Sequence, residues 1–165
     1  MRKRLAVLLC VLAPVLVAAA ASPAGGVAAT ACSPAAIHHG PPPAWTGAAF
    51  GPSTGGHVPP FAVSGHAAAA AFFFAPTLRA GNPSNPANKV LWVVRYARDG
   101  SPLRISGRYG ANTAVTAKSS WPDNSSPGEI YPSYVNLPRA GCWELTLRWS
   151  SHQARIDVEV HPRAH

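Results

Sequence analysis

One pentapeptide in the chain has the spacing of a hydrolase nucleophile. Residues 51–55 read Gly-Pro-Ser-Thr-Gly, which matches the G-x-S-x-G pattern with Ser53 at its centre. In hydrolases with this pattern the serine lies between a strand and a helix, which aims its hydroxyl at the substrate. Residues 56–60 (GHVPP) cannot begin a helix, and no acidic residue lies near them in the sequence. We therefore expect a turn here, and a serine hydrolase using Ser53 with a histidine is kept only as an alternative.

Four histidines suggest metal binding as a second chemistry. His38, His39, His57 and His66 all lie in a region without charged residues. Neutral imidazoles bind zinc or copper, and an exported protein encounters both metals. The spacing fits no closed tetrahedral pattern, however, and no carboxylate is available locally. We expect these histidines to be exposed in loops, with no metal and no cofactor bound, while a metal-handling surface lipoprotein is the alternative.

The N-terminal residues have the layout of a secretory signal. Arg2, Lys3 and Arg4 precede an apolar run over residues 5–21, and small residues at 29–31 offer an A-x-A cleavage site. We expect cleavage after Ala31, although a cut near the end of the apolar run fits that run better and leaves the site open. An uncleaved membrane anchor is the alternative, because the run approaches the roughly 20 residues that span a bilayer.

Two cysteines remain once the signal, which contains Cys10, has been removed. We expect Cys32 and Cys142 to form a disulfide, because the extracellular compartment is oxidising and a lone thiol is a liability there. The alternative for Cys32 is acylation, since residues 29–31 are small, as they are before the cysteine of a bacterial lipoprotein. The usual Leu or Val three residues before that cysteine is missing. Under this alternative Cys142 is a buried thiol.

The charge distribution argues against a nucleic-acid partner. The chain has 14 Lys and Arg against 6 Asp and Glu, a formal net charge of +8. A nucleic-acid-binding face concentrates its basic residues and places aromatic residues between them. Here the basic residues are scattered, and the nearest approach to a patch is Arg95, Arg98, Arg104 and Arg108. We expect these arginines to lie on the solvated faces of strands.

Residues 32–60 and residues 61–165 differ in composition. The first segment is rich in Pro, Gly, Ala and His, so we predict an extended arm, packed locally by Trp45 and Phe50 if it packs at all. The second segment shows a series of short strand patterns and no convincing helix. It therefore predicts one antiparallel, immunoglobulin-like β-sandwich. The predicted organisation is a signal over residues 1–31, the arm over 32–60 and the sandwich over 61–165.

The first strands of the sandwich are expected in runs of small, β-branched and aromatic residues. Residues 67–74 (AAAAAFFF) are ambiguous by periodicity, but the aromatic cluster and the following proline favour a buried strand. Residues 89–97 and 103–109 flank Asp99 and Gly100, a strong turn dipeptide, and are predicted to form a hairpin. A further short strand is predicted over residues 113–118.

The last strands are expected at a sheet edge and in a C-terminal hairpin. Residues 130–137 are extended, and Pro132 and Pro138 either keep this segment at a sheet edge or make it irregular. Residues 142–149 and 154–160 alternate between apolar and polar side chains, which predicts a hairpin with one buried and one wet face. Glu144 and Arg155 are expected to face one another across it.

Three segments carry a resemblance to known proteins. Residues 89–92 (KVLW), 103–108 (LRISGR) and 131–149 (YPSYVNLPRAGCWELTLRW) resemble a family of uncharacterised secreted bacterial proteins. In that family a YPS…P..GCW segment introduces the penultimate strand, and a cysteine near the mature N-terminus accompanies it. Cys142 and Cys32 stand at these two positions. The resemblance implies an exported β-sandwich and no particular activity.

Together these patterns predict an exported, non-enzymatic module that binds or interacts at the cell surface or in the medium. The sequence contains no phosphate-binding loop, HExxH motif or dinucleotide fingerprint. The partner is expected to be extracellular, and membrane contact is expected only through the signal or through lipidation at Cys32. Amphipathic aromatic residues favour interfaces, so the aromatic-bearing loops, for example at Trp121 and Tyr131, are the candidate contact surfaces. The alternative for each of these two residues is packing in the core or at its rim.

Overall fold

The computed structural model describes residues 32–50, 57–81, 88–110, 116–122 and 129–163. In these ranges, two short 3₁₀ helices, η1 (Ala44–Ala49) and η3 (Gly65–Ala67), accompany the strands. The strands are β1 (Phe61–Val63), β2 (Ala69–Phe73), β3 (Leu78–Arg79), β4 (Lys89–Val94), β5 (Leu103–Tyr109), β6 (Thr116–Trp121), β7 (Ile130–Tyr134), β8 (Gly141–Trp149) and β9 (His152–His161). Within these described ranges, no helix has the length and apolar character needed to cross a membrane.

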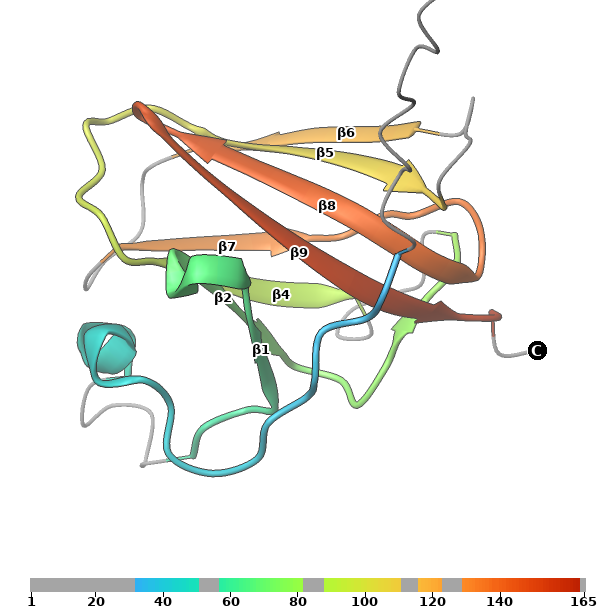
Figure 1. Cartoon of the computed structure of the whole chain (residues 1–165), viewed down its shortest axis with the longest axis horizontal. Coiled ribbons are helices and arrows are strands. Elements are labelled where there is room, and N and C mark those ends of the chain that lie inside the picture. Colours follow the sequence, from blue (N-terminus) through green and yellow to red (C-terminus); the bar gives the residue numbers. More distant parts are fainter. Residues whose placement is uncertain (1–31, 51–56, 82–87, 111–115, 123–128, 164–165) are drawn as a thin grey trace, which may run out of the picture.

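The strands form two packed sheets, which confirms the expected all-β sandwich (Figure 1). Sheet A has the order β1-β2-β4-β7, and sheet B has the order β3-β9-β8-β5-β6. The neighbouring strands are antiparallel except for β3, which runs parallel to the end of β9. β7 lies at an edge of sheet A, as the prolines of this segment predict. The predicted C-terminal hairpin is formed by β8 and β9.

The hairpin predicted for residues 89–97 and 103–109 is wrong. β4 pairs with β2 and β7 in sheet A, whereas β5 pairs with β6 and β8 in sheet B. Residues 95–102 therefore carry the chain from one sheet to the other, and we call them the crossover. Gly100 still adopts a left-handed conformation there, with φ of +86°. A turn dipeptide reports only local geometry, whereas the partner of each strand is set by which faces become buried.

The main core lies between the sheets and is built around three tryptophans. Trp92, Trp143 and Trp149 are fully buried, together with alternating apolar residues of both sheets. Each indole N–H donates a hydrogen bond, to Ser133 Oγ, to the Arg139 carbonyl and to the Tyr96 carbonyl respectively. A buried indole needs such a partner, because an unpaired donor would lose its hydration without compensation.

A second core covers the outer face of sheet A. Phe61, Phe72 and Leu91 belong to it, and Ala49 of η1 is buried against them. Trp45 and Phe50 pack against the same cluster, and the ring centroids of Phe50 and Phe72 are 4.5 Å apart. The arm is therefore not extended throughout. It leaves sheet B, crosses to sheet A and packs η1 against the outer face of that sheet (Figure 1).

The strand expected over residues 113–118 is β6, which runs to Trp121. Asn88, directly before β4, is 1% exposed. Its side chain bonds to both backbone groups of Arg79 and to the Val135 carbonyl, so it fastens β3 to sheet A.

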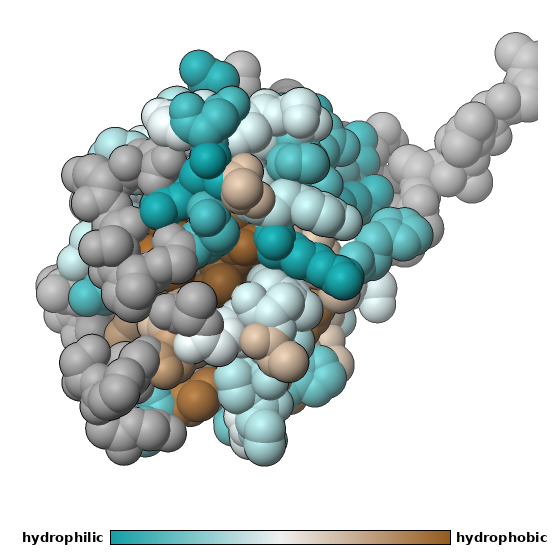
Figure 2. Space-filling view, turned by 90° about the vertical axis from the view of Figure 1, so that its left-hand side faces the viewer, coloured by the Kyte–Doolittle hydropathy of each residue, from teal (hydrophilic) through white to brown (hydrophobic). Residues whose placement is uncertain are grey.

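The crossover and the β8–β9 turn lie at one end of the molecule (Figure 1). Figure 2 looks onto this end and shows apolar surface in a recess between hydrophilic groups.

Candidate functional site

The predicted cysteine pair is bonded. The sulfurs of Cys32 and Cys142 are 2.06 Å apart, and their Cα atoms are 5.9 Å apart. Cys142 lies on the same face of β8 as Glu144, so the disulfide fastens the beginning of the arm to the outer face of sheet B. Neither sulfur is a free thiol that could act as a nucleophile or as a metal ligand.

The serine and histidine predictions do not converge on one place in the described structure. Ser53 and the rest of the G-x-S-x-G pattern lie outside the described residues. All four histidines of this region are exposed, and the ring of His38 stacks on Phe61 with centroids 5.3 Å apart. Among the residues that the structure describes, no three His, Cys, Asp or Glu side chains form a group that could hold a metal ion.

Tyr131 is a core residue, so the alternative considered for it holds and the surface-contact interpretation is wrong. Tyr131 lies in β7, is 0% exposed and packs into the main core. Its hydroxyl donates a hydrogen bond of 3.1 Å to the Ser101 carbonyl. Strand alternation explains the burial, because the neighbouring Ile130 and Pro132 face the other side of sheet A. Trp121 is half-buried at the end of β6 and packs against the core, and its role as a contact residue stays a prediction.

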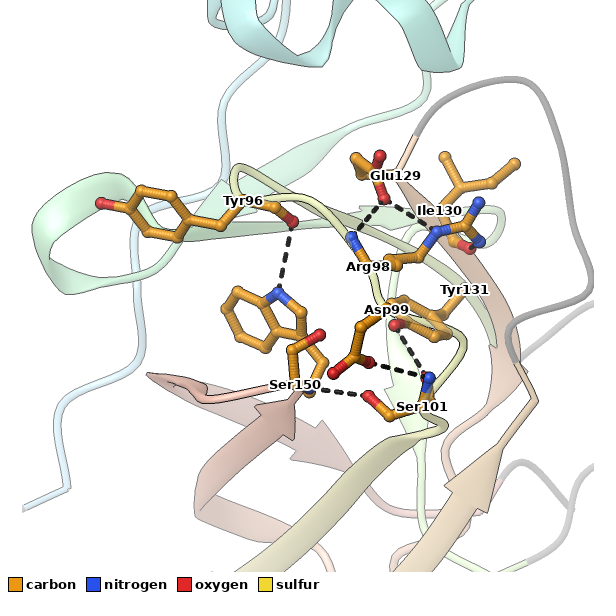
Figure 3. Close-up of polar contacts among 9 residues, drawn as sticks. Tyr96, Arg98, Asp99, Ser101, Glu129, Ile130, Tyr131 and Ser150 are labelled. Carbon is orange, nitrogen blue, oxygen red and sulfur yellow. Dashed lines mark hydrogen bonds and ion pairs between the residues drawn. The ribbon is translucent and has the colours of Figure 1, made fainter.

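The polar cluster of the crossover is held together by its own hydrogen bonds (Figure 3). The backbone N–H and Nε of Arg98 both donate to Glu129 Oε2, at 2.9 and 2.8 Å, and Nη1 donates to the Ile130 carbonyl. The Ser150 N–H donates to Ser101 Oγ at 2.7 Å, which ties the crossover to the β8–β9 turn. These bonds fix three chain segments to one another, so we interpret this cluster as structural.

Asp99 is a carboxyl of this cluster whose pKa is lowered. Hydrogen bonds from the side chain and the backbone N–H of Ser101 lower the pKa of Asp99 below its ordinary value of 3.8. The backbone bond from Ser101 measures 3.0 Å. A lowered pKa keeps the carboxylate ionised, which suits a turn that it stabilises as an acceptor and does not suit a proton donor.

The outer face of sheet B carries balanced charges near the disulfide. Glu144 Oε2 lies 2.8 Å from Nη2 of Arg108 and 2.8 Å from Nη2 of Arg155. Arg155 Nε also lies 3.3 Å from Asp157 Oδ1. The predicted pair between Glu144 and Arg155 is thus confirmed, although the two residues are diagonal neighbours rather than direct ones. This part of the face has paired positive and negative groups.

The other end of the same face carries two arginines that are directly opposite one another. Arg104 of β5 and Arg148 of β8 are register partners, and both are exposed. Their next partners across the sheet are uncharged, Ser120 on β6 and Gln153 on β9. Neither guanidinium forms a hydrogen bond or ion pair with any residue in the described ranges. Like charges directly opposite in a sheet destabilise it, so an anion between them would relieve the repulsion.

A shallow recess of about 500 Å³ opens over this arginine pair. Besides the two arginines, it is lined by Ile105, Ser106, Ser119 and Ser120. Guanidinium groups and hydroxyls are the donors that bind carboxylate, phosphate and sulfate oxygens. We name Arg104, Arg148, Ser106 and Ser120 the arginine face.

Sequence reasoning missed this pairing. It grouped Arg104 with Arg95, Arg98 and Arg108, which are its neighbours along the chain. In the structure, Arg98 forms an ion pair with Glu129 and Arg108 forms one with Glu144. The alternation of the predicted strands was a usable signal, since it placed Arg148 on the wet face. The missing information was that β5 lies beside β8, and in which register.

Comparison with known proteins adds no relative. No family model matches the chain, and no curated protein and no solved structure matches it significantly.

Proposed function

We propose that this chain is an exported, non-enzymatic binding module that uses the arginine face to hold an anionic extracellular ligand. The observation that carries the proposal is the cross-strand register of Arg104 and Arg148 without an acidic partner in the described structure. Arg108 and Arg155 on the same face are both paired with Glu144, and this contrast strengthens the proposal. The recess between the two arginines then fits an oxyanion group better than any uncharged one.

Export is supported by the signal-like N-terminus and by the disulfide. A bond between Cys32 and Cys142 persists only where thiols are oxidised. It also favours a soluble mature form over a lipoprotein, because one sulfur cannot carry both a disulfide and the thioether of a lipid anchor. The expected first residue of the mature chain is Cys32.

The proposed class is an immunoglobulin-like sandwich related to uncharacterised secreted bacterial proteins. Two mainly antiparallel sheets that enclose buried tryptophans support this class. One departure is the disulfide, which joins the arm to one sheet, whereas the bond of antibody domains links the two sheets. The segment 131–149 that carries the family resemblance forms β7, β8 and their connection.

Binding to immobilised polyanions tests the proposed ligand class. The mature protein is passed over dextran sulfate, polygalacturonate and polyphosphate surfaces, with neutral dextran as the reference, to distinguish sulfate, carboxylate and phosphate groups. We expect binding to at least one polyanion, with affinity that falls as salt rises, because exposed charges are screened over about 10 Å at 0.1 M ionic strength.

A matched pair of double variants separates the arginine face from overall charge. The R104A/R148A variant is expected to lose at least tenfold in affinity. The R95A/R163A variant removes two exposed arginines elsewhere and is expected to bind within twofold of the wild type. Equal losses in both variants would reduce the effect to net charge and refute the proposal, as would stronger binding to duplex DNA than to every extracellular polyanion.

Intact mass spectrometry tests export independently of the ligand. The protein is recovered from an exporting bacterial host and measured with and without reduction and alkylation. A mass that begins at Cys32 and gains two alkyl groups only after reduction is the expected result. A diacyl or triacyl mass on Cys32 would replace the soluble module with a surface lipoprotein.

A further inference from the structure

The free edge of β9 suggests a second binding site. β9 spans His152–His161, but its neighbour β3 pairs only with Val160 and His161. Along the rest of this edge, the described residues include no strand beside β9. An open edge attracts extended chains, and exported proteins usually cover or charge such edges.

The backbone groups of alternate residues point away from β8 along this edge. The carbonyl of Asp157 accepts from the N–H of Ala35, and the carbonyl of His161 accepts from the N–H of Ala80, so both face the open side. The β8–β9 register is continuous, and residues two apart in a strand present their backbone groups to the same side. Gln153 and Arg155 therefore aim their N–H and carbonyl groups outward, and the described structure gives these groups no backbone partner.

The arm already shows that this edge accepts an added chain. The Ala35 N–H bonds to the Asp157 carbonyl at 2.8 Å, and the Ser33 N–H bonds to Asp157 Oδ2 at 3.0 Å. The arm forms these hydrogen bonds at Asp157 and none with the outward backbone groups of Gln153 and Arg155. A further strand would thus continue a ladder that the arm has begun.

A recess of about 490 Å³ lies beside the unpaired positions. Its apolar lining consists of Val63 of β1, Ala68 between η3 and β2, and Ala154 and Ile156 of β9, together with Ala35 of the arm. The arginine on this edge does not obstruct it, since Arg155 is held on the outer face by Glu144 and Asp157.

The opposite wall of the recess is η3, whose backbone is strained. His66 and Ala67 adopt φ of +62° and +49°, which non-glycine residues rarely do. Such strain persists only where the surrounding structure holds it, and it concentrates at binding sites.

We propose that the β9 edge, from Gln153 to Arg155, binds an extended peptide segment of a partner protein by strand addition. The peptide's backbone would pair with the outward groups of Gln153 and Arg155. Its alternate side chains would be small and apolar where they face Ala154, Val63 and Ala68, and polar where they lie level with Gln153. Gln153 is the register partner of Arg148, but this site uses backbone groups on the open side of β9, whereas the arginine face uses side chains of β5, β6 and β8. Either proposal can therefore fail without the other.

The probe is a synthetic peptide, acetyl-Lys-Val-Thr-Val-Thr-Val-Lys-amide, titrated into the disulfide-bonded mature protein by fluorescence polarisation with a labelled copy. We expect saturable binding that is lost when alternate backbone nitrogens of the peptide are methylated, because methylation removes the donors of a ladder. Amide exchange followed by NMR should show fast exchange at Gln153 and Arg155 in the free protein and at least tenfold slower exchange with the peptide.

The Q153P variant removes one outward N–H, and proline is tolerated in an edge strand where that N–H faces solvent. We expect it to weaken peptide binding at least tenfold, whereas Q153T, which keeps the N–H, stays within twofold of the wild type. If Q153P does not fold, the methylated peptide decides the question on the wild type. Equal binding of both peptides overturns the proposal. So does slow exchange at Gln153 without peptide, or a dimer in sedimentation that the peptide does not dissociate.

Discussion

The two sheets bury their faces differently, although both are built from short strands. Every residue of β2 is buried, and so is every residue of β4 after Lys89, because the main core covers one face of sheet A and the arm covers the other. β8 and β9 alternate instead, with apolar residues toward the core and polar residues toward solvent. Sheet B therefore has a face available for charged groups, and sheet A has only its edges.

This difference explains why the two sheets have different sequence patterns. A strand buried on both faces is a continuous apolar run, whereas a strand with one wet face alternates. The AAAFF sequence of β2 is thus an indication that something covers the outer face of sheet A. That cover is η1 with Trp45 and Phe50, a part of the chain whose composition suggested a loose arm.

The largest loss of unfolding free energy is expected when the disulfide, which anchors the arm to sheet B, is removed. Replacing both Cys32 and Cys142 with alanine opens a loop of sequence separation 110. The expected loss is about 4 to 5 kcal/mol of unfolding free energy, by the chain-entropy estimate. Urea unfolding of the variant and of the oxidised wild type measures it. An unchanged midpoint would mean that the packing of the arm alone holds it in place.

A cavity on the outer face of sheet A should be nearly as damaging. Phe72 is 0% exposed and contacts the rings of Phe50 and Phe61. Phe72→Ala is expected to lower the unfolding free energy by about 4 kcal/mol, because it removes a fully buried ring. Thr146→Ala, on the outer face of sheet B, should change it by less than about 0.5 kcal/mol. Similar losses at the two positions would show that the two outer faces do not differ.

The charged network on sheet B should contribute a smaller amount. Glu144→Gln keeps the shape of the side chain but removes the charge shared by Arg108 and Arg155. We expect a loss of about 1 kcal/mol, since the arginines are partly exposed and the ion pairs are screened. Glu159→Gln, an exposed residue on the same face, is the control and should be neutral. A double-mutant cycle with Arg108→Ala isolates the pair, and a coupling of zero contradicts it.

The smallest effect is expected at Asp99 in the crossover, and it should depend on pH. Its pKa is lowered in the folded state by hydrogen bonds from Ser101, so the unfolded chain binds the proton more readily. The stabilisation is therefore fully present above pH 3.8, the ordinary pKa that the unfolded chain retains. It is lost as the pH falls through the lower pKa of Asp99 in the folded state. Asp99→Asn should be less stable than the wild type at neutral pH, with the difference vanishing in strong acid. A constant difference at all pH values would argue against this linkage.

Some features of the candidate site could be predicted from the sequence, and others could not. The wet faces of β8 and β9 and the pair between Glu144 and Arg155 followed from alternation alone. The opposition of Arg104 and Arg148 did not, because it depends on β5 lying beside β8 in one register. The edge of β9 was equally hidden, since no local pattern reveals which strand lacks a neighbour.

The sequence by itself determined the all-β class, the disulfide partners, the C-terminal hairpin and the edge position of β7. These depend on residue type, side-chain alternation and proline chemistry, which act over a few residues or leave a single pairing. Only the tertiary structure decided that Asp99 and Gly100 lie in a crossover between sheets, that Tyr131 is buried and that the arm covers sheet A. Such choices depend on which combination of faces buries the most apolar surface, and this is a property of contacts between residues far apart in the chain.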